Sequence, residues 1–121
     1  MKLILLAAIV ASALIGVSTA AAAGSITACD AITGCSATTI TSADGVYFTV
    51  STGGGNRDFA SVEVSCDNGY STVLNVVVPP KSDGTSQTIY PPAGSCVANL
   101  EKQMQIGKAR ILASVSFAVT P

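Results

Sequence analysis

The chemistry open to this chain is limited first by the residue types that it lacks. Its 121 residues contain no His and no Trp, so a Ser-His or Cys-His catalytic pair and a histidine metal site are excluded within the chain. Paired carboxylates can act as acid and base, but Asp58 is expected at the start of a helix and Glu101 on a solvated helix face. The sequence therefore predicts no enzyme, no catalytic residue, no cofactor and no metal. The carboxylates considered are Asp44, Asp58, Glu63, Asp67 and Glu101.

Two glycine-containing segments bear a superficial likeness to functional motifs. The run Gly53-Gly54-Gly55-Asn56-Arg57 lacks the Lys-Ser/Thr pair of a phosphate-binding loop. It is expected to be a turn between a strand and a helix. The triplet Asp83-Gly84-Thr85 resembles an aspartic-protease motif only in composition, because the order is wrong, and it also predicts a turn.

Four cysteines stand at Cys29, Cys35, Cys66 and Cys96. An even number in a short secreted chain indicates two structural disulfides. Three pairings are open, and the sequence does not choose among them. Long-range bridges that tie the amino-terminal segment onto the body are expected, each worth about 2–4 kcal/mol.

The amino terminus predicts secretion. Residues 1–23 combine a basic start, an apolar centre and a small-residue end, as in a signal peptide cleaved after Ala20 or Ala23. Residues 24–121 then form a single extracellular domain without a membrane span. Five basic and seven acidic residues remain in it, so its net charge of −2 provides no basic surface for nucleic acid.

Hydrophobic patterns predict both strands and helices in the mature chain. Residues 24–43 are expected to be an irregular lead-in. Ser95 and Gly107 delimit an expected helix, with Val97, Leu100 and Met104 on its apolar face. Strands are expected over residues 46–51, 72–78, 87–90 and 111–119, the last with Ile111, Ala113, Val115, Phe117 and Val119 on one face.

Residues 56–68 are ambiguous from the local pattern. Phe59, Val62 and Cys66 share one face of a helix that begins at Asn56 or Asp58. Alternation of apolar and polar residues, with Asn68-Gly69 as a hairpin turn, favours a strand equally well. The helix predicts an α+β fold with two helices on one face of an antiparallel sheet, in the split βαβ, ferredoxin-like order. The hairpin predicts a β-rich domain with a single helix.

Two segments carry a resemblance to a known family. The strand 46–51 leads through the glycines to a capped segment that ends in Cys66, and Ala93-Gly94-Ser95-Cys96 opens a second one. Over residues 29–119 this resembles the KP-six type killer toxins of smut fungi and the fungal effectors that share their fold. The resemblance implies two helices on a four-stranded sheet, favours a helix at 56–68, and implies action by binding.

The function expected is therefore that of a secreted, cysteine-stapled binding protein. It would be a monomeric fungal effector or killer-toxin-like protein that binds a surface protein of a host or competitor. A structural or cell-surface protein and a small hydrolase inhibitor, using the loop 81–86, are the alternatives. Tyrosines, an arginine and a polar loop can anchor interfaces, so the candidate binding surface comprises Tyr47, Arg57, Ser82, Asp83 and Tyr90.

Overall fold

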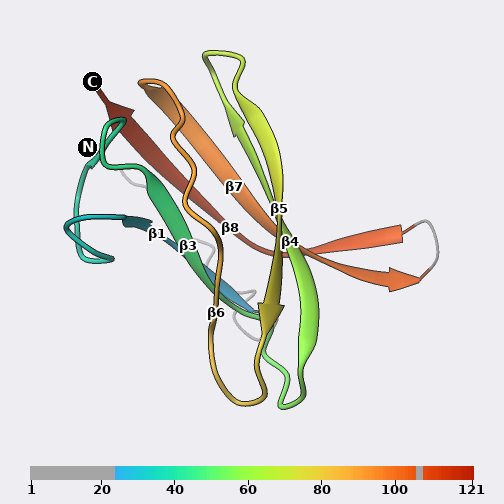
Figure 1. The fold of residues 1–121 in the computed structure, drawn as a ribbon. Coiled ribbons are helices and arrows are strands. Elements are labelled where there is room, and N and C mark those ends of the chain that lie inside the picture. The colour runs from blue at the N-terminus through green and yellow to red at the C-terminus, as the bar shows by residue number, and fades with distance from the viewer. Residues whose placement is uncertain (1–23, 106–107) are drawn as a thin grey trace, which may run out of the picture.

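The computed structural model describes residues 24–105 and 108–121. Side chains are described for all of these residues except 103–105, 108 and 109. The expected signal peptide lies outside the described residues. Two sheets make up the fold (Figure 1), one with strand order β1-β3-β6 and one with order β2-β8-β7-β4-β5. The strands are β1 (Ser25–Asp30), β2 (Ile40–Thr41), β3 (Val46–Ser51), β4 (Asp58–Cys66), β5 (Ser71–Val78), β6 (Gly84–Thr85), β7 (Gly94–Gln105) and β8 (Lys108–Thr120).

The α+β fold expected from the sequence is wrong, because the described residues contain no helix. The ferredoxin-like order and the alternative with a single helix fail for the same reason, as do the two helices implied by the killer-toxin resemblance. The irregular lead-in expected at 24–43 is wrong where the chain forms β1 and β2, whereas residues 31–39 between them are turns and irregular structure. The expected strand at 87–90 is reduced to one bridge between Val46 and Ile89.

Within the ambiguous segment 56–68, residues 58–66 form the strand β4, because their alternation places apolar residues in the core. Ala60, Val62 and Val64 of β4 are buried, whereas Phe59 and Glu63 are exposed. Asn68-Gly69 then makes the hairpin turn to β5, with the Cys66 N–H bonded to the Tyr70 carbonyl. Gly69 takes a φ of 92°, which a residue without a Cβ adopts without strain.

The expected helix at 95–107 also proves to be a strand. Cys96, Ala98 and Leu100 point into the core at a spacing of two, and β7 pairs with both β4 and β8. The spacing of Val97, Leu100 and Met104 fitted a helix. Pairing with a strand on each side of the segment outweighs this local helical pattern. Ser95 is no helix cap, since its N–H donates to Asp67 Oδ1 at 3.1 Å.

A β-bulge in β8 changes which residues face the core. The register moves from Leu100 opposite Ala113 to Glu101 opposite Ile111, so Leu112 is the additional residue. Leu112 is buried and Ile111 is 57% exposed. The single apolar face expected for residues 111–119 is therefore wrong at Ile111 and holds from Ala113 onward.

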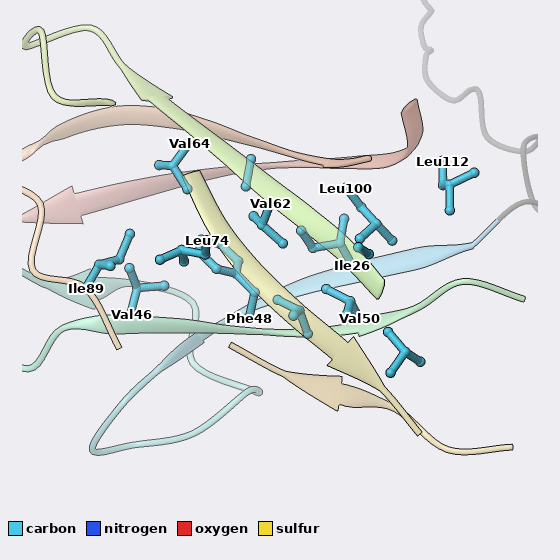
Figure 2. Packing of buried hydrophobic residues seen from close by; sticks show 14 of the residues in the cluster. Ile26, Val46, Phe48, Val50, Val62, Val64, Leu74, Ile89, Leu100 and Leu112 are labelled. Carbon is cyan, nitrogen blue, oxygen red and sulfur yellow. The ribbon is translucent and has the colours of Figure 1, made fainter. Parts of the chain in front are cut away.

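The core lies between the two sheets, and Figure 2 shows its side chains meeting there. Phe48 at the centre of β3 is fully buried and packs edge-on against Phe117 at a ring distance of 5.6 Å. The remaining positions are filled mostly by β-branched and aliphatic residues, whose stiff side chains suit a pleated sheet. They include Ile26, Val46, Val50, Val62, Val64, Leu74, Val76, Leu100 and Leu112.

The disulfides pair Cys29 with Cys35 and Cys66 with Cys96, which accounts for all four cysteines. Two disulfides are therefore confirmed. The expected long-range bridge from the amino-terminal segment to the body is wrong, because Cys29–Cys35 spans only 6 residues. Cys66–Cys96 spans 30 residues and joins directly opposed positions of β4 and β7.

The two disulfides should contribute unequally to stability. Loop-closure entropy gives about 3.5 kcal/mol for a separation of 30 residues and about 2 kcal/mol for a separation of 6. Replacing Cys66 and Cys96 by Ala should thus lower the free energy of unfolding more than replacing Cys29 and Cys35 by Ala. Urea denaturation of both double variants measures the difference. Equal losses, or the reverse order, would contradict this ranking.

Candidate interaction surface

The sequence-predicted surface residues fall into two groups at opposite ends of β3. Tyr90 follows Ile89, which pairs with Val46 at the start of the strand, whereas Asp83 precedes Gly84, which pairs with Val50 near its end. Four residues of an extended strand separate these positions by roughly 13 Å. Tyr47 lies near the first end, and Arg57 and Ser82 near the second, so the five residues do not form one surface.

The individual side chains in these groups also differ in accessibility. Tyr90 is 62% exposed. Tyr47 is half-buried, with its hydroxyl 3.5 Å from Cys35 Sγ. Arg57, Ser82 and Asp83 are exposed.

The loop 81–86 is anchored over its second half, which bears on its expected use as an inhibitor loop. Ser86 is 7% exposed, and its hydroxyl accepts the Phe48 N–H at 2.9 Å and donates to the Gln87 carbonyl. Gly84 is buried against β5, where a Cβ would come within 2.7 Å of the Val77 carbonyl oxygen. Residues 81–83 are exposed and lie outside this anchored half, in which the Thr85 side chain is also exposed.

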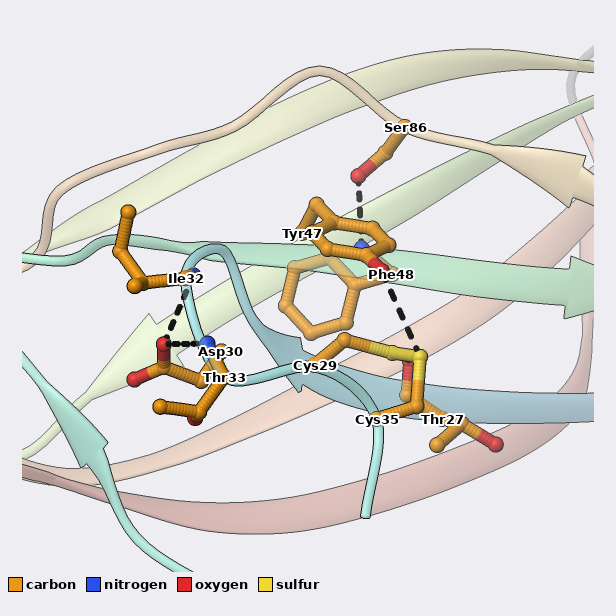
Figure 3. Close-up of a disulfide and its surroundings, with 9 residues drawn as sticks. All are labelled: Thr27, Cys29, Asp30, Ile32, Thr33, Cys35, Tyr47, Phe48 and Ser86. Atoms are coloured by element: carbon orange, nitrogen blue, oxygen red, sulfur yellow. Dashed lines mark hydrogen bonds between the residues drawn. A yellow bond between two sulfur atoms is a disulfide. The ribbon is translucent and has the colours of Figure 1, made fainter. Parts of the chain in front are cut away.

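Asp30 is a buried carboxylate that the sequence analysis did not single out. It is 1% exposed, and Figure 3 shows its Oδ1 accepting the N–H groups of Ile32 and Thr33, at 2.8 and 2.9 Å. These bonds hold the turn that carries Cys35 toward Cys29. An Asp ahead of a glycine turn, here at Gly34, is the sequence signal that indicates such a bond.

The hydrogen bonds around Asp30 also separate its pKa from that of Asp44. The backbone N–H bond from Thr33, together with those from Ile32 and Thr41 and the side-chain hydrogen bond with Asp44, outweighs burial and lowers the pKa of Asp30 to about 2. Burial, the hydrogen bond with Asp30 and the Asp30 charge raise the pKa of Asp44. The two carboxyls pin the segment 31–44, which is a structural role.

Asp58 and Asp67 likewise tie strands together. Asp58 Oδ1 lies 2.9 Å from Lys102 Nζ, and Oδ2 accepts the Thr52 hydroxyl at 2.8 Å. The Lys102 bond, followed by the Thr52 bond, lowers the pKa of Asp58. Its expected position at a helix start is wrong, since it begins β4. The Asp67 carboxylate accepts a hydrogen bond from the Ser95 N–H and so joins the β4–β5 turn to β7.

The outer face of the five-stranded sheet collects exposed apolar side chains. We define the outer face as the outward positions of β5, β4, β7 and β8, which alternate with the core positions. No helix packs on this face, since the described residues form none. Phe59 opposes Val77 across β4 and β5. The large apolar residues of the outer face are Phe59 (68% exposed), Val73 (58%), Ile111 (57%), Val77 (50%) and Val97 (42%).

Glu63 and Glu101 place two carboxyls among these apolar residues. Glu63 lies opposite Asn99, and Glu101 lies opposite Ser61 on the same pair of strands. Partial burial, then the hydrogen bond with Glu63 and the Glu63 charge, raise the pKa of Glu101. Next to them, the Ser114 hydroxyl bonds Asn99 Oδ1 at 2.6 Å. Glu101 is therefore no solvated helix residue but a half-buried strand residue that forms an acidic pair with Glu63.

A hollow of about 220 Å³ lies elsewhere, between β1, the segment 37–40 and β8. Its lining includes Ala28, Ile40 and Phe117 and contains no titratable side chain. Among the described residues, no three Cys, Asp or Glu side chains gather as a metal site would require. No helix in that part of the chain is long and apolar enough to cross a membrane.

The Asp30 carboxylate should make the protein sensitive to strong acid. Because its folded pKa of about 2 lies below the ordinary 3.8, its contribution to stability is complete above about pH 4 and is lost as the pH falls toward 2. Asp30→Asn should therefore lower the free energy of unfolding at pH 7, with a smaller deficit at pH 2. Denaturant titrations at several pH values test this.

Asp44→Asn is the matched control for that experiment. Since the folded state raises the pKa of Asp44, ionising this carboxyl costs stability as the pH rises through that pKa. Removing the charge should leave the protein as stable at pH 7 or more so. A loss for Asp44→Asn as large as that for Asp30→Asn would contradict the assignment.

Comparisons with known proteins returned no relatives. No protein-family model matches the chain, and neither the curated proteins nor the solved structures contain a match. The outer face and its acidic pair therefore rest on the chain's own geometry.

Proposed function

We propose that the mature chain is an extracellular binding protein that uses the outer face of its five-stranded sheet. The two disulfides agree with a small secreted protein stabilised by cysteines. The single observation that carries the proposal is that five large apolar residues, each more than 40% exposed, lie on one face of the sheet, with Phe59 directly opposite Val77. Phe59 and Val77 form the contiguous apolar part of this face, whereas Val73 lies opposite Glu63 and Val97 lies opposite Ser65 and Ser116. Exposed apolar patches mark interaction sites in soluble proteins.

Charge on the outer face defines the partner further. The charged groups at its described outward positions are Glu63 and Glu101, and both are acidic. A cation placed between them would relieve the repulsion that helps to raise the pKa of Glu101. The partner would therefore present apolar side chains around a Lys or Arg.

The biological role that we propose is that of an effector or killer-toxin-like protein acting on a host or a competitor. A rigid sheet lets the side chains of the outer face dock with little loss of conformational entropy. This role also follows the expected secretion and the binding mode implied by the sequence resemblance. No catalytic step is part of the proposal.

A single substitution on the outer face tests both the use of this face for binding and the effector role. The purified mature protein, its reduced and alkylated form, and Phe59→Ser would be applied to plant leaf tissue and to competing fungal cells. The intact protein should provoke cell death or a defence response, and Phe59→Ser should lose it at an unchanged melting temperature, because Phe59 is 68% exposed.

Ile32→Ser is the matched control, since Ile32 is an equally exposed apolar residue (74%) in the turn after β1, away from the outer face. It should act like the unmodified protein. Equal activity of Phe59→Ser and Ile32→Ser would contradict the use of the outer face, and an inactive intact protein would contradict the effector role.

Binding should also depend on the acidic pair. Cell binding of the labelled protein should weaken as the pH falls through the raised pKa of Glu101, because the protonated carboxyl no longer attracts a cation. Glu63→Gln removes the neighbouring charge and should move this midpoint to lower pH. Binding measured between pH 4 and 7 by flow cytometry tests the shift, and an unmoved midpoint would argue against the pair.

A further inference from the structure

β5 forms an edge of the five-stranded sheet, with backbone groups directed away from its only partner. It pairs with β4 alone, and no other backbone hydrogen bond from residues 71–78 occurs in the described part of the chain. The bond from Cys66 N–H to the Tyr70 carbonyl sets the alternation, so Thr72 and Leu74 bond to β4. The backbone N–H and C=O groups of Ser71, Val73 and Asn75 therefore point away from β4, in the plane of the sheet, and have no strand partner.

Only part of this edge is open. At its far end Gly84 of β6 lies so close that a Cβ there would approach the Val77 carbonyl oxygen to 2.7 Å. This contact covers the edge around Val77. It also agrees with the alternation, because the carbonyl of Val77, like those of Val73 and Asn75, points away from β4. Ser71 to Asn75 remains as the open edge.

The open edge lacks the devices that usually prevent strand pairing. Natural edge strands are protected by charge, shortness or a covering segment. At the opposite side of the sheet, β2 has two residues, the segment 37–40 lies beside β8 at the hollow, and Arg110 is exposed farther along β8. The open edge of β5 contains no charged side chain.

We propose that the open edge pairs antiparallel with the same edge of a second copy of this chain. A two-fold axis through Val73 sets Val73 against Val73, so two apolar residues that are 58% exposed in one copy meet on the outer face. The same axis sets the Ser71 hydroxyl opposite the Asn75 amide of the second copy. Thr72 opposes Leu74 on the inner side.

The residues of the open edge are thus complementary to themselves, as an isologous contact requires. Outward N–H and C=O groups are exchanged at Ser71, Val73 and Asn75, and no like charges meet. The contact is short, so it should form a weak, reversible dimer. The two sheets would join into one, and two outer faces would lie side by side for bivalent binding. This dimer takes the place of the monomer expected from the sequence.

Sedimentation equilibrium of the mature, disulfide-bonded protein between about 10 µM and about 1 mM tests the proposal. The mean mass should rise toward that of a dimer with concentration. Val73→Lys places two ammonium groups opposite each other and should raise the dissociation constant by at least about tenfold.

Val97→Lys is the matched control, because Val97 is also an exposed valine of the outer face, on the interior strand β7. It should dimerise like the unmodified protein. A monomer at every concentration would overturn the proposal. So would an equal loss in both variants, because the copies would then associate through the outer faces.

Hydrogen exchange separates edge pairing from any other association. The amides of Val73 and Asn75 should exchange more slowly at high concentration than at low concentration, whereas the Leu74 amide should be protected at both. Unchanged exchange at Val73 and Asn75 in a sample that does dimerise would overturn the edge-to-edge geometry.

Discussion

The pairing of β4 with β7 is the contact on which the rest of the structure depends. β4–β5 and β7–β8 are each local hairpins, and β4–β7 is what joins them into one sheet. The Cys66–Cys96 disulfide closes this pairing at one end, and Asp58–Lys102 lies toward the other. The acidic pair of the outer face exists only while both hairpins stay aligned, because Glu63 and Glu101 come from different hairpins.

The sequence predicts the elements whose signals are local. β3 is predicted at its observed bounds, and β5 within one residue, because both are short β-branched runs between turn residues. For β4 the sequence offered the strand as an equal alternative, and only the resemblance favoured a helix. For β7 the helix was expected because intervals of three and four residues occur by chance in an alternating strand, and its pairing with β4 and β8 is not a local signal. The short β1 and β2 depend on partners at β3 and β8, which no local pattern indicates.

The candidate site shows the same division between local and distant information. Tyr47, Tyr90 and Arg57 were suggested by residue type, which says nothing about where strands bring them. The outer face follows from alternation, so Phe59, Val73 and Val77 would emerge once β4 and β5 are known to pair. Ile111 is different, because a bulge of one residue decides which side it occupies, and bulge positions depend on packing at Leu112.

Strict alternation along β4 and β5 has a consequence for how such a protein can evolve. Every second residue is committed to packing between the sheets, while the residues between them face away from the core and meet only one another and the surroundings of the sheet. Substitutions at the outward positions therefore disturb the core little, so the chemistry of the outer face can change repeatedly on an unchanged scaffold. Rapid divergence at odd-numbered positions of these strands, beside slow change at even-numbered ones, is the pattern that such selection would leave.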